Sequence, residues 1–131
     1  MRRVLLIAIV VSLLFGVGAS QVTARGGGDG SEARAAGVCG SGATSQLRLR
    51  QRGGGDIDVR FQVEHTRSGQ IWRVTLVRER RVVWRGQART RRGSFEIERR
   101  IPDFSGADHV TARAISPRGL TCSASATLPG G

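Results

Sequence analysis

Apolar and polar residues alternate with a period of two along most of the chain after Gln46. This alternation is typical of β-strands that bury one face and expose the other. The clearest example is 57–64, in which apolar residues occupy the odd positions and polar residues the even ones. The same pattern predicts further strands at 47–50, 72–76, 82–89, 95–101, 110–114 and 122–128.

Turn-forming residues separate these segments, and no helical period is found among them. About seven short strands joined by turns favour an all-β fold made of a single antiparallel β-sandwich. Residues 43–131 are therefore predicted to form one domain of the immunoglobulin-like or fibronectin type III-like kind. Trp72 and Trp84 share the parity of apolar neighbours, so both are expected in the core, with an exposed sugar-binding platform as the alternative.

The N-terminal segment 1–24 has the pattern of a secretory signal peptide. A positive head at Arg2 and Arg3 precedes an apolar run, and small residues follow that permit cleavage after Ala19 or Ala24. The apolar stretch is shorter than the roughly 20 residues that span a membrane. The predicted localisation is therefore secreted, and the alternative is a membrane tether formed by an uncleaved N-terminal segment.

Residues 25–42 are rich in glycine, alanine, serine and single charges. Such a composition offers little apolar surface to bury, so it does not offset the entropy lost on ordering. The segment is predicted to be a flexible linker between the signal peptide and the β-domain.

Cys39 and Cys122 are the only cysteines, and in an exported protein such a pair predicts a disulfide bond. The alternative is a redox or metal-binding pair, but the two residues lack CxxC spacing. Cys122 shares the parity of Ala124 and Ala126, so it is expected to point into the core. A loop of this length makes the bond worth on the order of 4 kcal/mol in the chain-entropy description.

Several of these segments together resemble small exported actinobacterial proteins of unknown function. The resemblance covers most of the expected domain and rests on Cys39-Gly40, Leu47-Arg48-Leu49, 69–76, 107–114 and Cys122. It implies the same β-sandwich and the same disulfide. It carries over no catalytic or ligand-binding residue.

The chain has a net charge of +11, and all 21 of its basic residues are arginine. A GC-rich genome also produces such a bias, but the physical consequence is a surface that attracts polyanions in either case. The alternative is a solvated outer face in which glutamates pair with the arginines. The candidate polyanion-binding residues are Arg48, Arg50, Arg78, Arg80, Arg81, Arg85, Arg89, Arg91 and Arg92.

Nothing in the sequence pairs His65 or His109 with a nucleophile and a carboxylate, and no known catalytic motif is present. Glu96 and Glu98 share a strand face, but the neighbouring arginines favour their ionised form over acid–base catalysis. Two separated histidines and scattered aspartates make no metal-ligand set. The protein is therefore predicted to be no enzyme and to need no cofactor or metal.

The sequence predicts a binding or structural module of the cell envelope or extracellular space that holds acidic polymers on an arginine-rich face. The expected partners are an anionic cell-wall polymer, a lipid head group or another extracellular polyanion, and not intracellular nucleic acid. One alternative is a protein–protein interaction module that uses a sheet edge or the Trp84 hairpin. Another is a small secreted enzyme inhibitor that inserts the loop 102–108 or 91–94 into its target.

Overall fold

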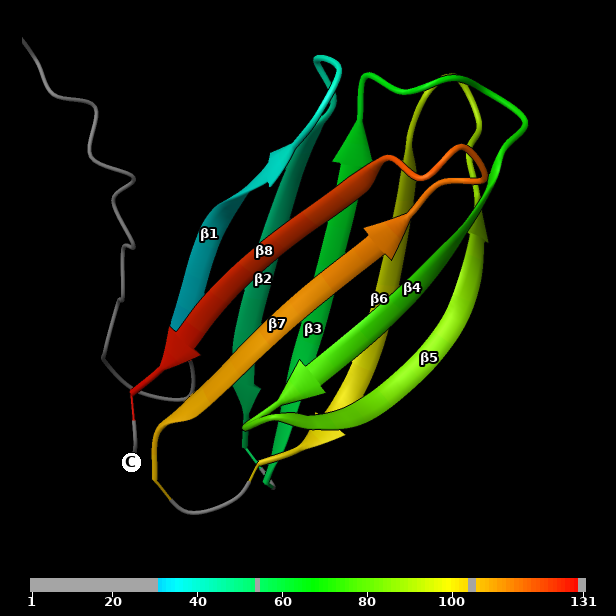
Figure 1. Cartoon of the computed structure of the whole chain (residues 1–131). Coiled ribbons are helices and arrows are strands. Elements are labelled where there is room, and N and C mark those ends of the chain that lie inside the picture. Colours follow the sequence, from blue (N-terminus) through cyan, green and yellow to red (C-terminus); the bar gives the residue numbers. More distant parts are fainter. Residues whose placement is uncertain (1–30, 54, 104–105, 130–131) are drawn as a thin grey trace, which may run out of the picture.

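Eight antiparallel strands are hydrogen-bonded into one continuous sheet in the computed structural model of this chain (Figure 1). The structure describes residues 31–53, 55–103 and 106–129, and these ranges contain no helix. The predicted signal peptide and residues 25–30 of the predicted linker lie outside them. The strands are β1 (Glu32–Cys39), β2 (Thr44–Arg52), β3 (Asp56–Glu64), β4 (Ile71–Arg78), β5 (Arg81–Arg89), β6 (Phe95–Pro102), β7 (Asp108–Ile115) and β8 (Thr121–Leu128).

The sheet has the order β5-β4-β7-β8-β1-β2-β3-β6 and folds over on itself into a nearly closed, barrel-like shape (Figure 1). Strand β1 belongs to both halves, because its residues 32–37 pair with β2 while Val38 and Cys39 pair with β8. The two end strands, β5 and β6, come into contact without pairing. Trp84 of β5 lies half-buried near this gap, and the guanidinium carbon of Arg99 on β6 is 4.5 Å from its ring centroid.

The all-β antiparallel prediction is confirmed, but the described residues form eight strands rather than about seven. The additional strand is β1, so the prediction of a linker over 25–42 is wrong for Glu32–Cys39. Alanine and glycine rarely favour strands by themselves, but here pairing on both sides orders them. The strand beside β2 is β3, whereas an immunoglobulin domain places its fifth strand beside its second.

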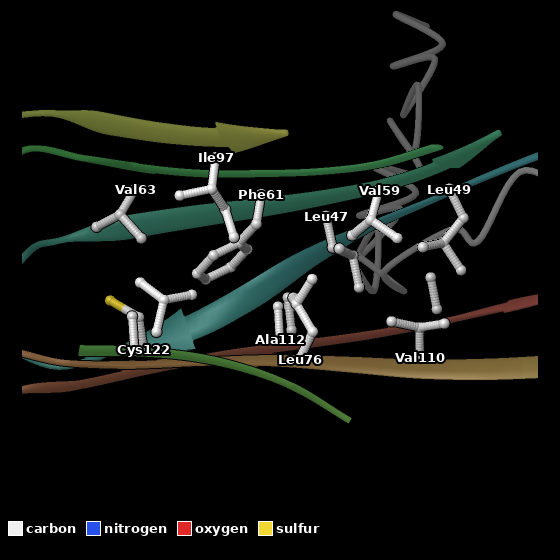
Figure 2. Close-up of a cluster of buried hydrophobic side chains, with 14 of the residues drawn as sticks. Leu47, Leu49, Val59, Phe61, Val63, Leu76, Ile97, Val110, Ala112 and Cys122 are labelled. Carbon is white, nitrogen blue, oxygen red and sulfur yellow. The ribbon is translucent and has the colours of Figure 1, made fainter. Parts of the chain in front are cut away.

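The core consists of the inward residues of both halves of the sheet (Figure 2). Leu47, Leu49, Val59 and Phe61 come from one half, and they face residues such as Leu76 from the other (Figure 2). Strands β3, β4, β7 and β8 contribute every second side chain, as the alternation predicts.

Trp72 is fully buried, so the prediction that it lies in the core is confirmed. Its ring centroid is 5.6 Å from that of Phe95, which packs from the opposite half of the sheet.

The disulfide bond between Cys39 and Cys122 joins directly paired residues of β1 and β8. Their Cα atoms are 4.3 Å apart. Cys122 is fully buried, as its parity predicts. The bond therefore fixes the end of β1 to the half of the sheet that it has just joined.

Gly37 occupies the point where β1 passes from β2 to β8. A Cβ atom built on this glycine would lie 2.7 Å from the Cβ of Ala124, and still closer to Ser45 Oγ and to the backbone oxygen of Ser123. No other residue type fits there without a shift of the backbone. The crossing therefore depends on the absence of a side chain.

We expect Gly37→Ala to lower the free energy of unfolding by about 1–3 kcal/mol, because overpacking forces backbone shifts. Urea denaturation of the oxidised protein measures this change. Gly53→Ala is the matched control, since a Cβ at Gly53 meets no atom within 4 Å. Equal stability of the two variants would show that the crossing tolerates a side chain.

Candidate functional site

The two outer faces of the sheet differ in their carboxylates. We call the outward side chains of β1, β2, β3 and β6 the paired face, because arginines and carboxylates occur there in equal number. Its arginines are Arg34, Arg48, Arg50, Arg52, Arg60 and Arg100, and its carboxylates are Glu32, Asp56, Asp58, Glu64, Glu96 and Glu98. The charges on this face balance.

Ion pairs connect the strands of the paired face. Arg60 of β3 binds Glu96 at 3.1 Å and Glu98 at 2.5 Å, both on β6. Asp58 binds both Arg52 and Arg100, the latter at 3.4 Å. These arginines are therefore partly neutralised by their own neighbours, as the alternative of a mixed solvated face predicts.

The pKa values of three carboxyl groups respond to these arginines. The hydrogen bond from Arg34 lowers the pKa of Glu32, and that from Arg60 lowers the pKa of Glu98. Burial raises the pKa of Asp58, but the bonds from Arg52 and Arg100 together outweigh it, so the pKa is lowered. All three groups thus hold their negative charge more firmly in the folded protein.

The opposite outer face carries no aspartate or glutamate among its described residues. We call the outward side chains of β4, β5, β7 and β8 the acid-free face. They include Ile71, Arg73, Thr75, Val77, Arg85, Gln87, Arg89, His109, Thr111, Arg113, Ile115, Thr121, Ser123, Ser125 and Thr127, and the exposed Arg81, Val82 and Val83 begin β5 beside them. Every charged side chain in this set other than the histidine is an arginine.

The acid-free face contains a hollow of about 480 Å³. Arg73, Arg85 and Arg113 line it, and we call these three the arginine triad. Thr75 lies between them, because it pairs with Arg85 on β5 and with Arg113 on β7. Within the described part of the chain, no carboxylate forms an ion pair with any member of the triad.

Two carboxylates beside one end of this face make other contacts. Glu79, in the turn between β4 and β5, accepts a hydrogen bond of 2.9 Å from the backbone N–H of His109. Asp108, at the start of β7, points inward and is buried. Neither of the two forms an ion pair with the triad.

The nine predicted arginines do not form one patch. Arg85 and Arg89 lie on the acid-free face, whereas Arg48 and Arg50 lie on the paired face. The other exposed ones lie in or beside turns, with Arg80 and Arg81 at the β4–β5 turn and Arg91 and Arg92 at the β5–β6 turn.

Arg78 is mostly buried and paired, so it offers little of its charge to a polyanion. Its side chain is 11% exposed, and its Nε donates a hydrogen bond of 2.6 Å to Asp108 Oδ1. Burial raises the pKa of Asp108 and the carboxyl group of Asp103 adds to the rise, while Arg78 opposes it. The end position of Arg78 in its strand gave no sign of a partner on β7.

Arg73 and Arg113 were not among the predicted residues. Their alternation with buried neighbours indicates outward side chains, and this signal is present in the sequence. What the sequence did not indicate is that β4 lies between β5 and β7. Only this arrangement brings Arg73 and Arg113 beside Arg85.

The described residues contain no group of three His, Cys, Asp or Glu side chains that could hold a metal ion. His109 contacts Thr127 Oγ1 at 2.8 Å through Nδ1, and His65 lies in the turn after β3. Nor does any described segment form a helix long and apolar enough to cross a membrane.

Comparisons with known proteins give no match, because no family model, curated protein or solved structure is significantly similar to the chain.

We expect Asp108→Leu to lower the free energy of unfolding by about 1.5–3 kcal/mol, because it removes the charge-assisted hydrogen bond between two mostly buried side chains. The double variant Arg78→Met/Asp108→Leu should lose less than the sum of the two single variants, since both groups of the ion pair are then removed together. Urea denaturation of both variants forms a double-mutant cycle. Additive losses would contradict the coupling of the two residues.

We expect stability to fall as the pH drops below about 4, partly through Glu32, Asp58 and Glu98. Their lowered pKa values add stability above the pKa of the unfolded chain, and this contribution is lost as pH falls through the folded value. Asp58→Asn should reduce the acid-dependent loss by less than about 1 kcal/mol, because the group is partly exposed. Thermal unfolding from pH 3 to 7 measures it.

Asp56→Asn is the control for this series, because Asp56 lies on the same face of β3 without an ion pair to any described residue. Asp108 acts in the opposite sense, since a raised pKa adds stability that is lost as pH rises. Asp108 contributes equally to the pH profiles of the Asp58 and Asp56 variants, so its contribution cancels when one profile is subtracted from the other. An identical pH profile for both would contradict the role of the Asp58 ion pairs.

Proposed function

We propose that this protein is an exported, non-enzymatic binding module that holds acidic polymers of the cell envelope or extracellular space on its acid-free face. The observation that carries the proposal is the contrast between the two faces. Arg73, Arg85, Arg89 and Arg113 have no carboxylate among the outward side chains of their face, whereas the six arginines of the paired face share that face with six carboxylates.

The physical basis is the cost of like charges without counterions. Like charges that share one face repel at a distance even where, as in the triad, no two of them are direct cross-strand partners, and an added polyanion relieves this repulsion while releasing its own condensed ions. Guanidinium groups also form paired hydrogen bonds with the oxygens of phosphate, sulfate and carboxylate groups. On the paired face five of the six arginines already form ion pairs with carboxylates, so a polyanion gains less there.

Export is part of the proposal and rests on the signal-peptide pattern at 1–24. The Cys39–Cys122 bond is compatible with an oxidising compartment. We also propose that the folded sheet acts as a rigid two-layer sandwich. The acid-free face is then the outer surface of one layer, and the core lies between the two layers. A tether through an uncleaved N-terminal segment would place the same face near the membrane.

Docking of a protein strand on a sheet edge has less support. The pairing of β5 with β4 shifts register between Leu76 and Val77 of β4, β5 carries several arginines, and β6 ends at Pro102. Bulges, charges and prolines on edge strands are features that oppose pairing with another chain. The inhibitor alternative has no support from the short loop at 91–94, which Arg91 and Ser94 close with reciprocal hydrogen bonds.

We expect the oxidised protein to bind dextran sulfate with an affinity that falls steeply between about 50 and 200 mM salt. Arg85→Gln/Arg113→Gln should lower the affinity about tenfold at the low-salt end and reduce the slope with salt. Isothermal titration calorimetry across the salt series measures both quantities.

The matched control is Arg48→Gln/Arg50→Gln, which removes the same charge from the paired face. Its affinity should change less than about threefold. Equal losses in the two double variants would mean that net charge alone drives binding. Affinity independent of salt would overturn the proposal.

A further inference from the structure

The arginine triad has a triangular arrangement on the sheet. Arg85 and Arg113 lie on the strands either side of Thr75, so their Cα atoms are about two strand spacings apart, roughly 9.6 Å. Arg73 precedes Thr75 by two residues on the same face of β4. The three side chains line one hollow whose centre holds a small hydroxyl side chain rather than a bulky one.

Three arginines that line one hollow offer more donors than a single carboxylate accepts. Each guanidinium offers a planar fork of N–H groups, and a carboxylate has two oxygens to receive them. A phosphate or sulfate ester group is tetrahedral and presents up to three terminal oxygens that diverge. Such a group can accept from three arginines on three sides, so the third arginine adds affinity for a tetrahedral oxyanion and little for a carboxylate.

Hydroxyl side chains continue from the triad across β7 and β8. Ser123 pairs directly with Arg113, and Thr111 and Ser125 share a hydrogen bond of 2.8 Å one rung further. A row of hydroxyl groups beside a cationic hollow suits the alternating hydroxyl and anionic groups of a sugar chain.

A lipid surface fits this face less well. Proteins that lie on membranes insert Trp, Phe or Leu beside their basic residues. The large apolar residues exposed in the described part of the chain are Val38, Ile71, Val82 and Val83, none of them aromatic. Trp84 is turned inward and covered by Arg99.

We infer that the arginine triad seats one sulfate or phosphate ester group of an anionic polysaccharide, with the sugar chain lying along the hydroxyl row of β7 and β8. This inference rests on the proposed function, since it names the ligand class of the same face. It assigns to Arg73 the role of a third hydrogen-bond donor to the ester group, in addition to its contribution to the positive charge of the face.

The test compares polymers with one backbone, which are dextran sulfate, dextran phosphate and carboxymethyl dextran of matched charge density and equal ionic strength. The oxidised protein should bind the sulfate and phosphate polymers at least about tenfold more tightly than the carboxymethyl polymer. Arg73→Gln should lower the first two affinities about tenfold and the third less than about threefold. Arg73→Lys should restore little, because an ammonium keeps the charge but not the fork.

Arg89→Gln is the matched control, because Arg89 lies on the same face outside the hollow. It should lower all three affinities equally and by less than threefold, roughly the effect of one long-range charge. A circular dichroism spectrum and melting temperature for each variant confirm that the fold is intact.

The outcomes separate the two proposals. Equal affinity for the carboxymethyl and sulfated polymers, both lost in Arg85→Gln/Arg113→Gln, would overturn the oxyanion seat and leave the polyanion-binding function standing. Absence of binding to all three polymers at low salt would overturn both.

Vesicles that contain roughly 30% phosphatidylglycerol test the lipid alternative. Tighter binding to these vesicles than to dextran phosphate would replace the polysaccharide with a lipid surface. Tight binding to only one of the sulfate and phosphate polymers would identify which of the two ester groups the triad binds.

Discussion

Strand β1 has to leave β2 and join β8 within its own length, and the two halves of the sheet meet only through this crossing. The crossing requires that the backbones of β1, β2 and β8 approach more closely than any side chain allows, which is why Gly37 lies there. The Cys39–Cys122 bond then ties the last residue of β1 to β8. Without the crossing, β2 and β8 would be open edges and the core between the halves would lose one wall.

This crossing also separates the surface into two faces. Strands on one side of β1 carry most of the carboxylates, and their register places opposite charges across neighbouring strands, as in Glu32, Arg50, Asp58 and Arg100. Strands on the other side carry arginines among threonine, serine and glutamine. The excess positive charge of the chain is therefore concentrated on one face and in the turns.

The strained turn between β4 and β5 is held in place by hydrogen bonds to β7. Glu79 and Arg80 form the two-residue turn between β4 and β5 with φ of 47° and 67°, values that L-residues adopt at some cost. Glu79 binds the backbone of His109, and Arg78 binds Asp108 beside it. These contacts hold the hairpin of β4 and β5 against β7, which keeps Arg85 and Arg113 on either side of Thr75.

The sequence by itself determined seven of the strands and the inward parity of residues such as Phe61, Trp72 and Cys122, because period-two alternation is a local pattern. It also determined the disulfide, because the chain has only two cysteines. It did not indicate β1, since Ala33, Ala35 and Gly37 are small residues with little strand preference, and the strand is ordered by pairing with β2 and, at its end, with the distant β8. Nor did the sequence indicate that the side chain of Arg78 is mostly buried whereas that of Arg73 is exposed. Only tertiary structure decided these points, because the pairing of β4 with β7 brings together residues that lie 30 positions apart, as Arg78 and Asp108 do.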